Sequence, residues 1–256
     1  NAGVSEYIYL RGASYGDYSV KDGGSSWDNN PPVFSGFNFN PMNLPYLAMK
    51  DKVQEKNITV EILANAGYAI PYYTNLSAET ILNDTRVNNS SNVYALSYIP
   101  ISSINIGDYS LEGTIYSTYE KEYREFVKNN YVDLPDSTKS AMLDVIAKEG
   151  FSATDPDVIN KVAKFVQGYL PYDLNTNYVG DYAEYFFNGA ETAICQHYAT
   201  AATALYRALG IPARYTIGFV GEVEANENTI IYAPGHAWVE VYFDGFGWVP
   251  VEVTGG

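Results

Sequence analysis

The chain has 256 residues, 46% of them hydrophobic and 18% charged, a composition that suits a globular protein with its own core. Its net charge of −15 disfavours phosphate-bearing partners, so we expect neither nucleic acid nor an anionic membrane face as a ligand. No apolar run reaches the roughly 18 residues of a membrane helix. Because the chain begins with Asn1 rather than methionine, we expect it to be excised from a longer protein, with cloning-derived residues at its front.

The first part of the chain, residues 3–134, is rich in Gly, Asn, Ser and Tyr and consists of short alternating segments. β-Branched and aromatic residues favour strands at 6–10, 58–63 and 93–98. We therefore predict a β-rich N-terminal module with long connections. Its tyrosines either pack its sheet or bind a cell-envelope polymer, and packing is the simpler interpretation.

After residue 134 the hydrophobic period becomes that of helices, so we predict a second domain over residues 135–256. One helix is expected at 136–150, capped by Asp136, and another at 154–170, where a proline at position 171 stops it. Residues 172–190 are predicted to form a loop that carries a cluster of aromatic residues.

A third helix is predicted over residues 195–209, where apolar residues recur on one helical face. Gly210 stops it, because glycine accepts the left-handed conformation that ends many helices. Several alanines let neighbouring elements approach closely, so we expect this helix to be central. Three strands follow, at 214–220, 236–243 and 248–253, and a turn over 244–247 joins the last two into a hairpin.

Cys195, the only cysteine, lies in the first turn of the third predicted helix. One thiol cannot form an intramolecular disulfide. One thiol and two histidines are also too few ligands for a typical metal site, so we expect no metal. The unpaired N–H groups of a helix start favour an anion, and the thiolate is the reactive form of cysteine. The same groups could stabilise an oxyanion. The alternative is that Cys195 is a buried structural thiol.

His236 begins the second predicted strand, where an accessible imidazole can serve as a general base. Glu252 lies on the partner strand of the hairpin. If the turn has an odd number of residues, Glu252 shares a face with His236 and can orient its ring; a two-residue turn would put it on the opposite face. His197 lies two residues from Cys195 on the helix, so it points away and is expected to be structural.

Four separated blocks around these residues resemble the core of the transglutaminase-like superfamily, in the family's order and spacing. They are residues 192–199 (Thr-Ala-Ile-Cys-Gln-His-Tyr-Ala), 205–214 (Leu-Tyr-Arg-Ala-Leu-Gly-Ile-Pro-Ala-Arg), 235–242 (Gly-His-Ala-Trp-Val-Glu-Val-Tyr) and 247–252 (Gly-Trp-Val-Pro-Val-Glu). Residues 181–187 resemble the aromatic segment before the nucleophile of bacterial members. Residues 10–12 and 131–135 are similar to the extracytoplasmic part of multi-span bacterial transglutaminase-like proteins.

This resemblance implies an α+β, papain-like fold in which a central helix packs on an antiparallel sheet. It implies that Cys195 is the nucleophile, His236 the base and Glu252 the orienting acid, with Trp238 and Tyr182 in supporting or substrate-lining positions. The family usually has Asp where this chain has Glu252, so the imidazole must sit differently or activity is reduced. A glycine common two residues before the cysteine is an alanine here.

The chemistry that such a triad implies is acyl transfer on protein or peptide amides through a thioester, without a cofactor. An amine that resolves the thioester gives a cross-linking enzyme, and water gives an amidase or cysteine peptidase. The rival class is an inactive binding or scaffold module that keeps only the fold. The resemblance also implies an extracellular or cell-envelope location and a membrane tether outside this chain.

Overall fold

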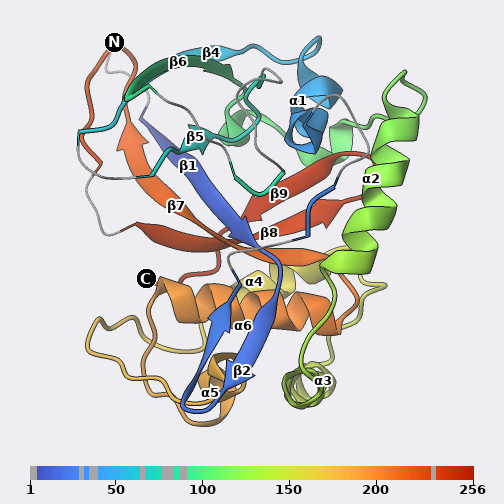
Figure 1. Cartoon of the computed structure of the whole chain (residues 1–256), viewed down its shortest axis with the longest axis vertical. Coiled ribbons are helices and arrows are strands. Elements are labelled where there is room, and N and C mark those ends of the chain that lie inside the picture. Colours follow the sequence, from blue (N-terminus) through green and yellow to red (C-terminus); the bar gives the residue numbers. More distant parts are fainter. Residues whose placement is uncertain are drawn as a thin grey trace.

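A five-stranded antiparallel sheet crosses the middle of the computed structural model, and its strand order is β5-β1-β7-β8-β9 (Figure 1). The structure describes residues 5–28, 32–34, 40–63, 67–76, 84–86, 91–231 and 235–256. The strands of this sheet are β1 (Glu6–Tyr15), β5 (Ile70–Pro71), β7 (Ala213–Val223), β8 (His236–Phe243) and β9 (Gly247–Val251).

Helices and two separate two-stranded sheets surround the central sheet. The helices are α1 (Leu44–Met49), α2 (Ser117–Asn130), α3 (Asp136–Glu149), α4 (Val158–Gln167), α5 (Tyr182–Asn188) and α6 (Cys195–Ala208), with short 3-10 turns at Pro41–Asn43, Ile101–Ser103 and Ile106–Asp108. One of the two-stranded sheets is a hairpin that pairs β2 (Tyr18–Lys21) with β3 (Gly24–Trp27). The other pairs β4 (Lys56–Glu61) with β6 (Val93–Tyr98), and β5 lies between these two strands in the chain.

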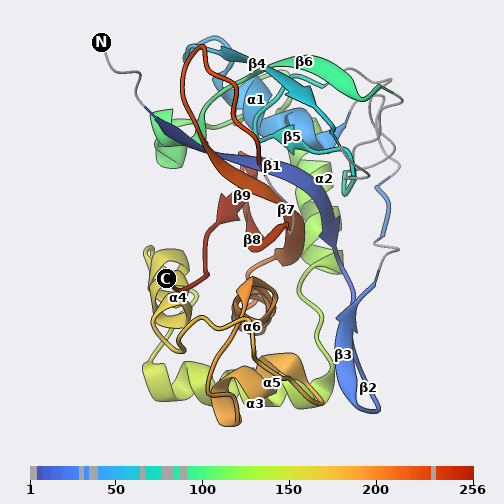
Figure 2. The ribbon, with the colours of Figure 1, turned by 90° about the vertical axis from the view of Figure 1, so that its left-hand side faces the viewer.

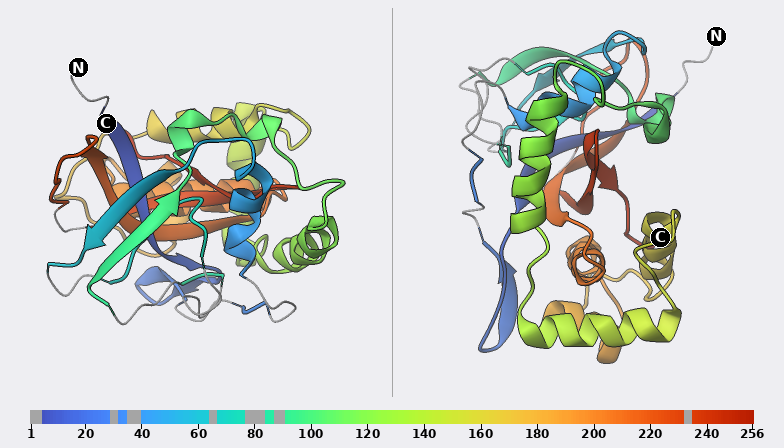
Figure 3. Two further views of the ribbon diagram at one scale, coloured as in Figure 1. Left: turned by 90° about the horizontal axis from the view of Figure 1, so that it is seen from above. Right: turned by 90° about the vertical axis from the view of Figure 1, so that its right-hand side faces the viewer.

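The two faces of the sheet have different cover. One face packs on α6, against which α3, α4 and α5 pack in turn, and the other lies under α1 and the β4–β6 pair (Figure 2). The side chains of β8 divide in the same way. Ala237, Val239 and Val241 belong to the core around α6, whereas Trp238 and Tyr242 belong to the opposite core. Helix α2 stands at the side of the sheet (Figure 3).

The predicted α+β fold with a central helix on an antiparallel sheet is confirmed. Helix α6 is enclosed by other elements, and its alanines at 199, 201, 202 and 204 are completely buried. Three helices differ from the sequence-based expectation, and one of them is the short α1, which was not predicted. Helix α5 replaces part of the loop predicted at 172–190, because the Asp181 carboxylate accepts hydrogen bonds from two N–H groups of its first turn. Helix α2 was not predicted, although Tyr123 and Val127 lie on one helical face and are buried.

The sheet takes strands from both sides of the boundary that we predicted between residues 134 and 135. Strand β1 lies between β5 and β7, and its pairing with β7 extends from Glu6 opposite Val223 to Tyr15 opposite Tyr215. The β2–β3 hairpin reaches down beside the helices below the sheet (Figures 2 and 3). The division into two domains stays a prediction. The backbone hydrogen bonds between β1 and β7 join the two predicted parts.

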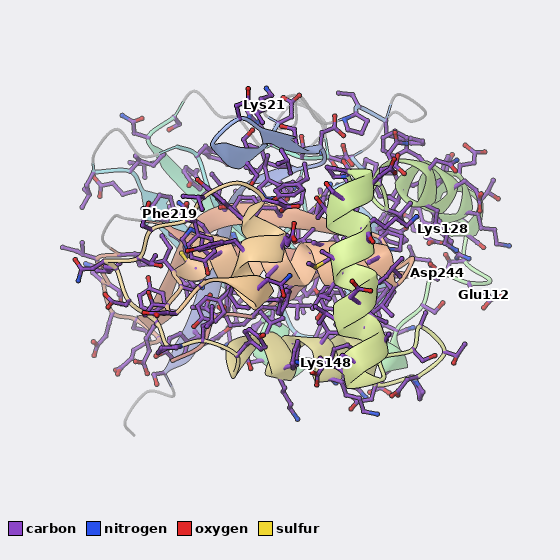
Figure 4. The ribbon with its side chains drawn as sticks, turned by 90° about the horizontal axis from the view of Figure 1, so that it is seen from below. Lys21, Glu112, Lys128, Lys148, Phe219 and Asp244 are labelled. Carbon is purple, nitrogen blue, oxygen red and sulfur yellow. The ribbon has the colours of Figure 1, made fainter. Side chains whose placement is uncertain are left out.

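Contacts with the first half of the chain fix the turn between β8 and β9. The turn has three residues, because Phe243 pairs with Gly247. The Glu120 carboxylate of α2 accepts hydrogen bonds from the Gly245 N–H and the Tyr242 hydroxyl, both at 2.9 Å. Lys128 adds an ion pair of 2.9 Å to Asp244, which lies in Figure 4 on the side of the molecule away from Phe219. The odd-numbered turn sets the register of β9 on β8.

A buried ionic cluster lies on the face of the sheet opposite α6, with Glu240 at its centre. Glu240 accepts hydrogen bonds from Arg11 at 2.6 Å, Arg214 at 2.7 Å, Tyr72 at 2.6 Å and Ser14 at 2.8 Å. Burial alone would raise the pKa of Glu240, but the two guanidinium groups outweigh it and hold that pKa at about 2. The cluster links β1, β7 and β8 and is stable only while its charges match.

We therefore expect Glu240→Gln to lower the free energy of unfolding by about 3–5 kcal/mol, because it leaves two buried guanidinium groups without their shared carboxylate. Urea denaturation at neutral pH measures the loss. The matched control is Glu112→Gln, since this carboxylate is exposed, and a change within about 0.5 kcal/mol is expected there. A loss below about 1 kcal/mol for Glu240→Gln would show that the cluster contributes little.

Candidate active site

The thiol of Cys195 lies at the start of α6, of which it is the first residue. The Cys195 side chain is 9% exposed. The segment before the helix is held by the chain at 171–173: the Ala193 N–H donates to the Pro171 carbonyl and the Asp173 N–H to the Ala193 carbonyl, both at 3.0 Å. This short parallel bridge places the Tyr172 hydroxyl where it accepts a hydrogen bond from the Cys195 N–H.

His197 has the structural role expected from the sequence. Its Nδ1 accepts a hydrogen bond of 3.2 Å from the Ile194 N–H, so the side chain caps the start of α6. Its ring stacks on Tyr178 with centroids 3.4 Å apart and meets Tyr182 edge-on. Burial lowers the pKa of His197 to about 4, so this imidazole is neutral at physiological pH.

His236 and Glu252 meet as the odd-numbered turn requires. The register of β9 places Pro250 opposite Glu240, and Glu252, one residue past the end of β9, continues toward His236 on the same face. The His236 Nε2 lies 2.8 Å from Glu252 Oε2. The His236 ring also makes a hydrogen-bond contact with the Cys195 side chain. Since Glu252 occupies Nε2, the nitrogen left for the thiol is Nδ1.

The electrostatics of these groups favour a charged imidazole. Burial by itself would lower the pKa of His236, but its interactions with Cys195 and Glu252 outweigh burial and raise this pKa to about 9. For Glu252, burial acts to raise the pKa, and the hydrogen bond and charge of His236 prevail and lower it. At neutral pH the pair is an imidazolium beside a carboxylate, which is the arrangement that orients a catalytic histidine.

Aromatic residues support this arrangement from the side opposite α6. Trp238 is fully buried, and its ring lies 6.1 Å from that of His236. Its indole N–H donates to the Tyr72 hydroxyl at 2.7 Å, which in turn reaches Glu240. Trp238 is therefore placed to support His236. Tyr182 lies against His197 and Gly24, and its role at the site stays a prediction.

Two tyrosines near the site were missed by the sequence-based reasoning. Tyr172 is the partner of the Cys195 N–H, and Tyr9 donates a hydrogen bond of 2.7 Å to Glu252 Oε2. Tyr172 follows a proline 23 residues before the nucleophile, and Tyr9 lies on β1. Neither position carries a local signal, because the chain has 25 tyrosines. Within the described residues, no cluster of three or more His, Cys, Asp or Glu side chains could hold a metal ion.

Comparisons with known proteins show what this part of the chain is similar to. The sequence profile of the transglutaminase-like superfamily matches residues 146–253, a range that contains Cys195, His236 and Glu252. Residues 146–253 belong to the transglutaminase-like superfamily. The superfamily assignment accounts for the order of the four sequence blocks.

Relatives extend the likeness beyond the matched range. The chain is 28% identical over 238 residues to the uncharacterized protein YebA of Bacillus subtilis (strain 168); the match covers 81% of this chain and 32% of YebA. This chain thus spans about a third of the length of that curated relative. Of the helices in the described part of this chain, none combines the length and apolar character that a membrane span needs.

Two crystal structures of the periplasmic domain of TgpA from Pseudomonas aeruginosa share the fold of the whole chain. The structure bound to ethylmercury has 16% identity, a TM-score of 0.55 and coverage of 98% of this chain and 90% of that one. The other has 15% identity, the same TM-score and coverage of 98% and 88%. The likeness includes the strands and helices before residue 146.

The two histidines of this chain should titrate far apart. We expect NMR of the imidazole resonances to give a pKa of about 9 for His236 and about 4 for His197. Cys195→Ala should lower the His236 value, because it removes an interaction that favours the imidazolium, and should leave His197 unchanged. Two pKa values near 6.5 would contradict the charged arrangement.

Proposed function

We propose that this chain is a cysteine-dependent acyltransferase that acts on amides of proteins or peptides. In this proposal Cys195 is the nucleophile, His236 the general acid and base, and Glu252 the carboxylate that orients the imidazole. The observation that carries it is the continuous contact from thiol to imidazole to carboxylate at the first residue of α6. The superfamily match over the same residues supports it.

The first half-reaction forms a thioester. The Cys195 thiolate attacks the carbonyl carbon of a carboxamide or peptide bond, and a C–S bond forms. The Tyr172 hydroxyl, whose oxygen accepts the Cys195 N–H, lies beside the thiol and can donate its own proton to the oxyanion. The His236 imidazolium then gives its Nδ1 proton to the departing nitrogen, the C–N bond breaks, and ammonia or an amine leaves.

The second half-reaction releases the acyl group. An amine or a water molecule attacks the thioester carbon while neutral His236 accepts its proton, and the C–S bond breaks to restore the thiolate. An amine gives a new amide cross-link, and water gives a carboxylic acid. The triad performs either step with the same atoms, so the acceptor defines whether the enzyme cross-links or hydrolyses.

Incubation with a glutamine peptide and a labelled primary amine tests the proposal. We expect release of ammonia by the folded chain, and Cys195→Ala should reduce it by about 10³-fold or more, because the nucleophile is lost. Label in the peptide identifies transfer to an amine, and ammonia without label identifies hydrolysis. Peptide-bond cleavage products in the same assay identify a peptidase. If neither ammonia nor cleavage depends on Cys195, the chain is a scaffold and the proposal fails.

The pH dependence of the reaction follows from the raised pKa of His236. The imidazolium protonates the leaving nitrogen, so kcat/KM should fall as pH rises through about 9, where His236 loses its proton. Below pH 8 the imidazolium is nearly fully populated, and the rate should not fall for this reason. A profile that already declines between pH 6 and 7 on its alkaline side would contradict the assigned role of His236.

We propose further that this chain works outside the cytoplasm, tethered to a membrane by parts of a longer protein. The fold of the TgpA periplasmic domain supports the location, and the length of YebA, of which this chain covers a third, leaves room for a tether. Fractionation of cells that express the full-length protein tests this proposal. Recovery of the enzyme in the cytoplasmic fraction would refute it.

A further inference from the structure

The carboxylate of Glu252 receives hydrogen bonds on both oxygens. Oε1 accepts the backbone N–H groups of Val253 at 3.0 Å and Thr254 at 2.9 Å, so the side chain folds back on the chain that follows it. Oε2 accepts His236 Nε2 at 2.8 Å and the Tyr9 hydroxyl at 2.7 Å. Among the contacts of the described residues, Tyr9 is therefore the one group other than His236 that binds Oε2, the oxygen that orients the His236 ring.

The ring of Tyr9 is held independently of its hydroxyl. It meets Trp238 edge-on, with centroids 5.3 Å apart, and Trp238 is anchored through Tyr72 to the buried Glu240. On the backbone, Tyr9 is paired with Val220 in the β1–β7 ladder. These contacts aim the hydroxyl at Glu252 from a rigid strand, so its position does not depend on the carboxylate that it binds.

A glutamate needs such a restraint more than an aspartate does. Its extra methylene adds one rotatable bond, and each free torsion weakens control over the direction of the carboxylate. The two backbone N–H groups fix Oε1, and the Tyr9 hydroxyl adds a donor beside His236 on Oε2. The family usually has aspartate here, and the tyrosine offers a physical reason why the longer side chain can be used.

We propose that Tyr9 is a positioning residue that holds the carboxylate of Glu252 in the geometry that orients His236. This inference rests on the proposed function of the Cys195 triad. Tyr9 lies outside the range that matches the superfamily, so the site is completed by a strand from the front of the chain. Burial and the charge of Glu252 raise the pKa of Tyr9 well above its usual value, so it stays a hydroxyl donor wherever the enzyme is active.

The test is Tyr9→Phe, which keeps the ring on Trp238 and removes only the donor. The measurement is the rate of Cys195 alkylation by iodoacetamide between pH 4 and 8, which reports the state of the triad without a substrate. The hydrogen bond from Tyr9 lowers the pKa of Glu252, so its loss should let Glu252 take up a proton at higher pH. The acid limb, in which the alkylation rate falls as pH is lowered, should therefore move to higher pH. At pH values within that limb we expect alkylation to slow by about tenfold.

Tyr7→Phe is the matched control. Tyr7 lies on the same strand and the same face of the sheet, two residues from Tyr9, and its side chain is 67% exposed. We expect its profile to equal that of the wild type. Thermal melts of both variants should match the wild type within a few degrees, which separates the positioning role from a loss of folding. An unchanged acid limb in Tyr9→Phe, or an equal shift in Tyr7→Phe, would overturn the inference.

A double-mutant cycle with Glu252→Ala shows whether Tyr9 acts through the carboxylate. Without that carboxylate, Tyr9→Phe should have no further effect on the alkylation profile, whereas a general effect of β1 on the site would add to it. The proposed function fails separately: it is lost if wild-type Cys195 is unreactive below pH 7 or if His236→Ala leaves its reactivity unchanged. If the thiol is reactive and depends on His236, but the profile of Tyr9→Phe is unshifted, the positioning role of Tyr9 is refuted and the proposed function stands.

Discussion

The register between β8 and β9 is the constraint on which the candidate site depends. Side chains alternate along a strand, so a turn one residue shorter would place Glu252 on the face that packs on α6. Its carboxylate would then lose its contact with the His236 ring. The hydrogen bond from the Gly245 N–H to Glu120 and the ion pair of Asp244 hold the three-residue turn. Both contacts come from α2, so a helix outside the superfamily match secures the pairing of imidazole and carboxylate.

Two glutamates on one face of the sheet differ in their surroundings, and this difference suits one to a structural role and the other to a role at the candidate site. Glu240 is completely buried and balanced by Arg11 and Arg214, so its charge is fixed and joins three strands. Glu252 is only partly buried and shares one oxygen between Tyr9 and His236. Its charge is used to stabilise an imidazolium whose proton can leave. The Trp238 indole connects these two environments through Tyr72.

The sequence was sufficient for features that depend on local pattern. The helix that starts at Cys195, the strand that starts at His236 and the stop at Gly210 all follow from periodicity and from glycine or proline signals. The partnership of His236 and Glu252 could be stated only as a condition on turn length, because residues of α2 decide that length. Tyr9 could not be found, since its contact with Glu252 spans 243 positions and no pattern marks one tyrosine among 25.

The pairing of β1 with β7 has a consequence for how the protein reaches its native state. These strands are separated by about 200 residues, so the central sheet can close only after β7 has been made. Until β1 docks, β7 presents a long open edge whose peptide groups can pair with other chains. A protein truncated at its front would keep Cys195 and His236 but expose the edge of β7. We therefore expect expression boundaries drawn around the candidate site alone to give an aggregation-prone protein.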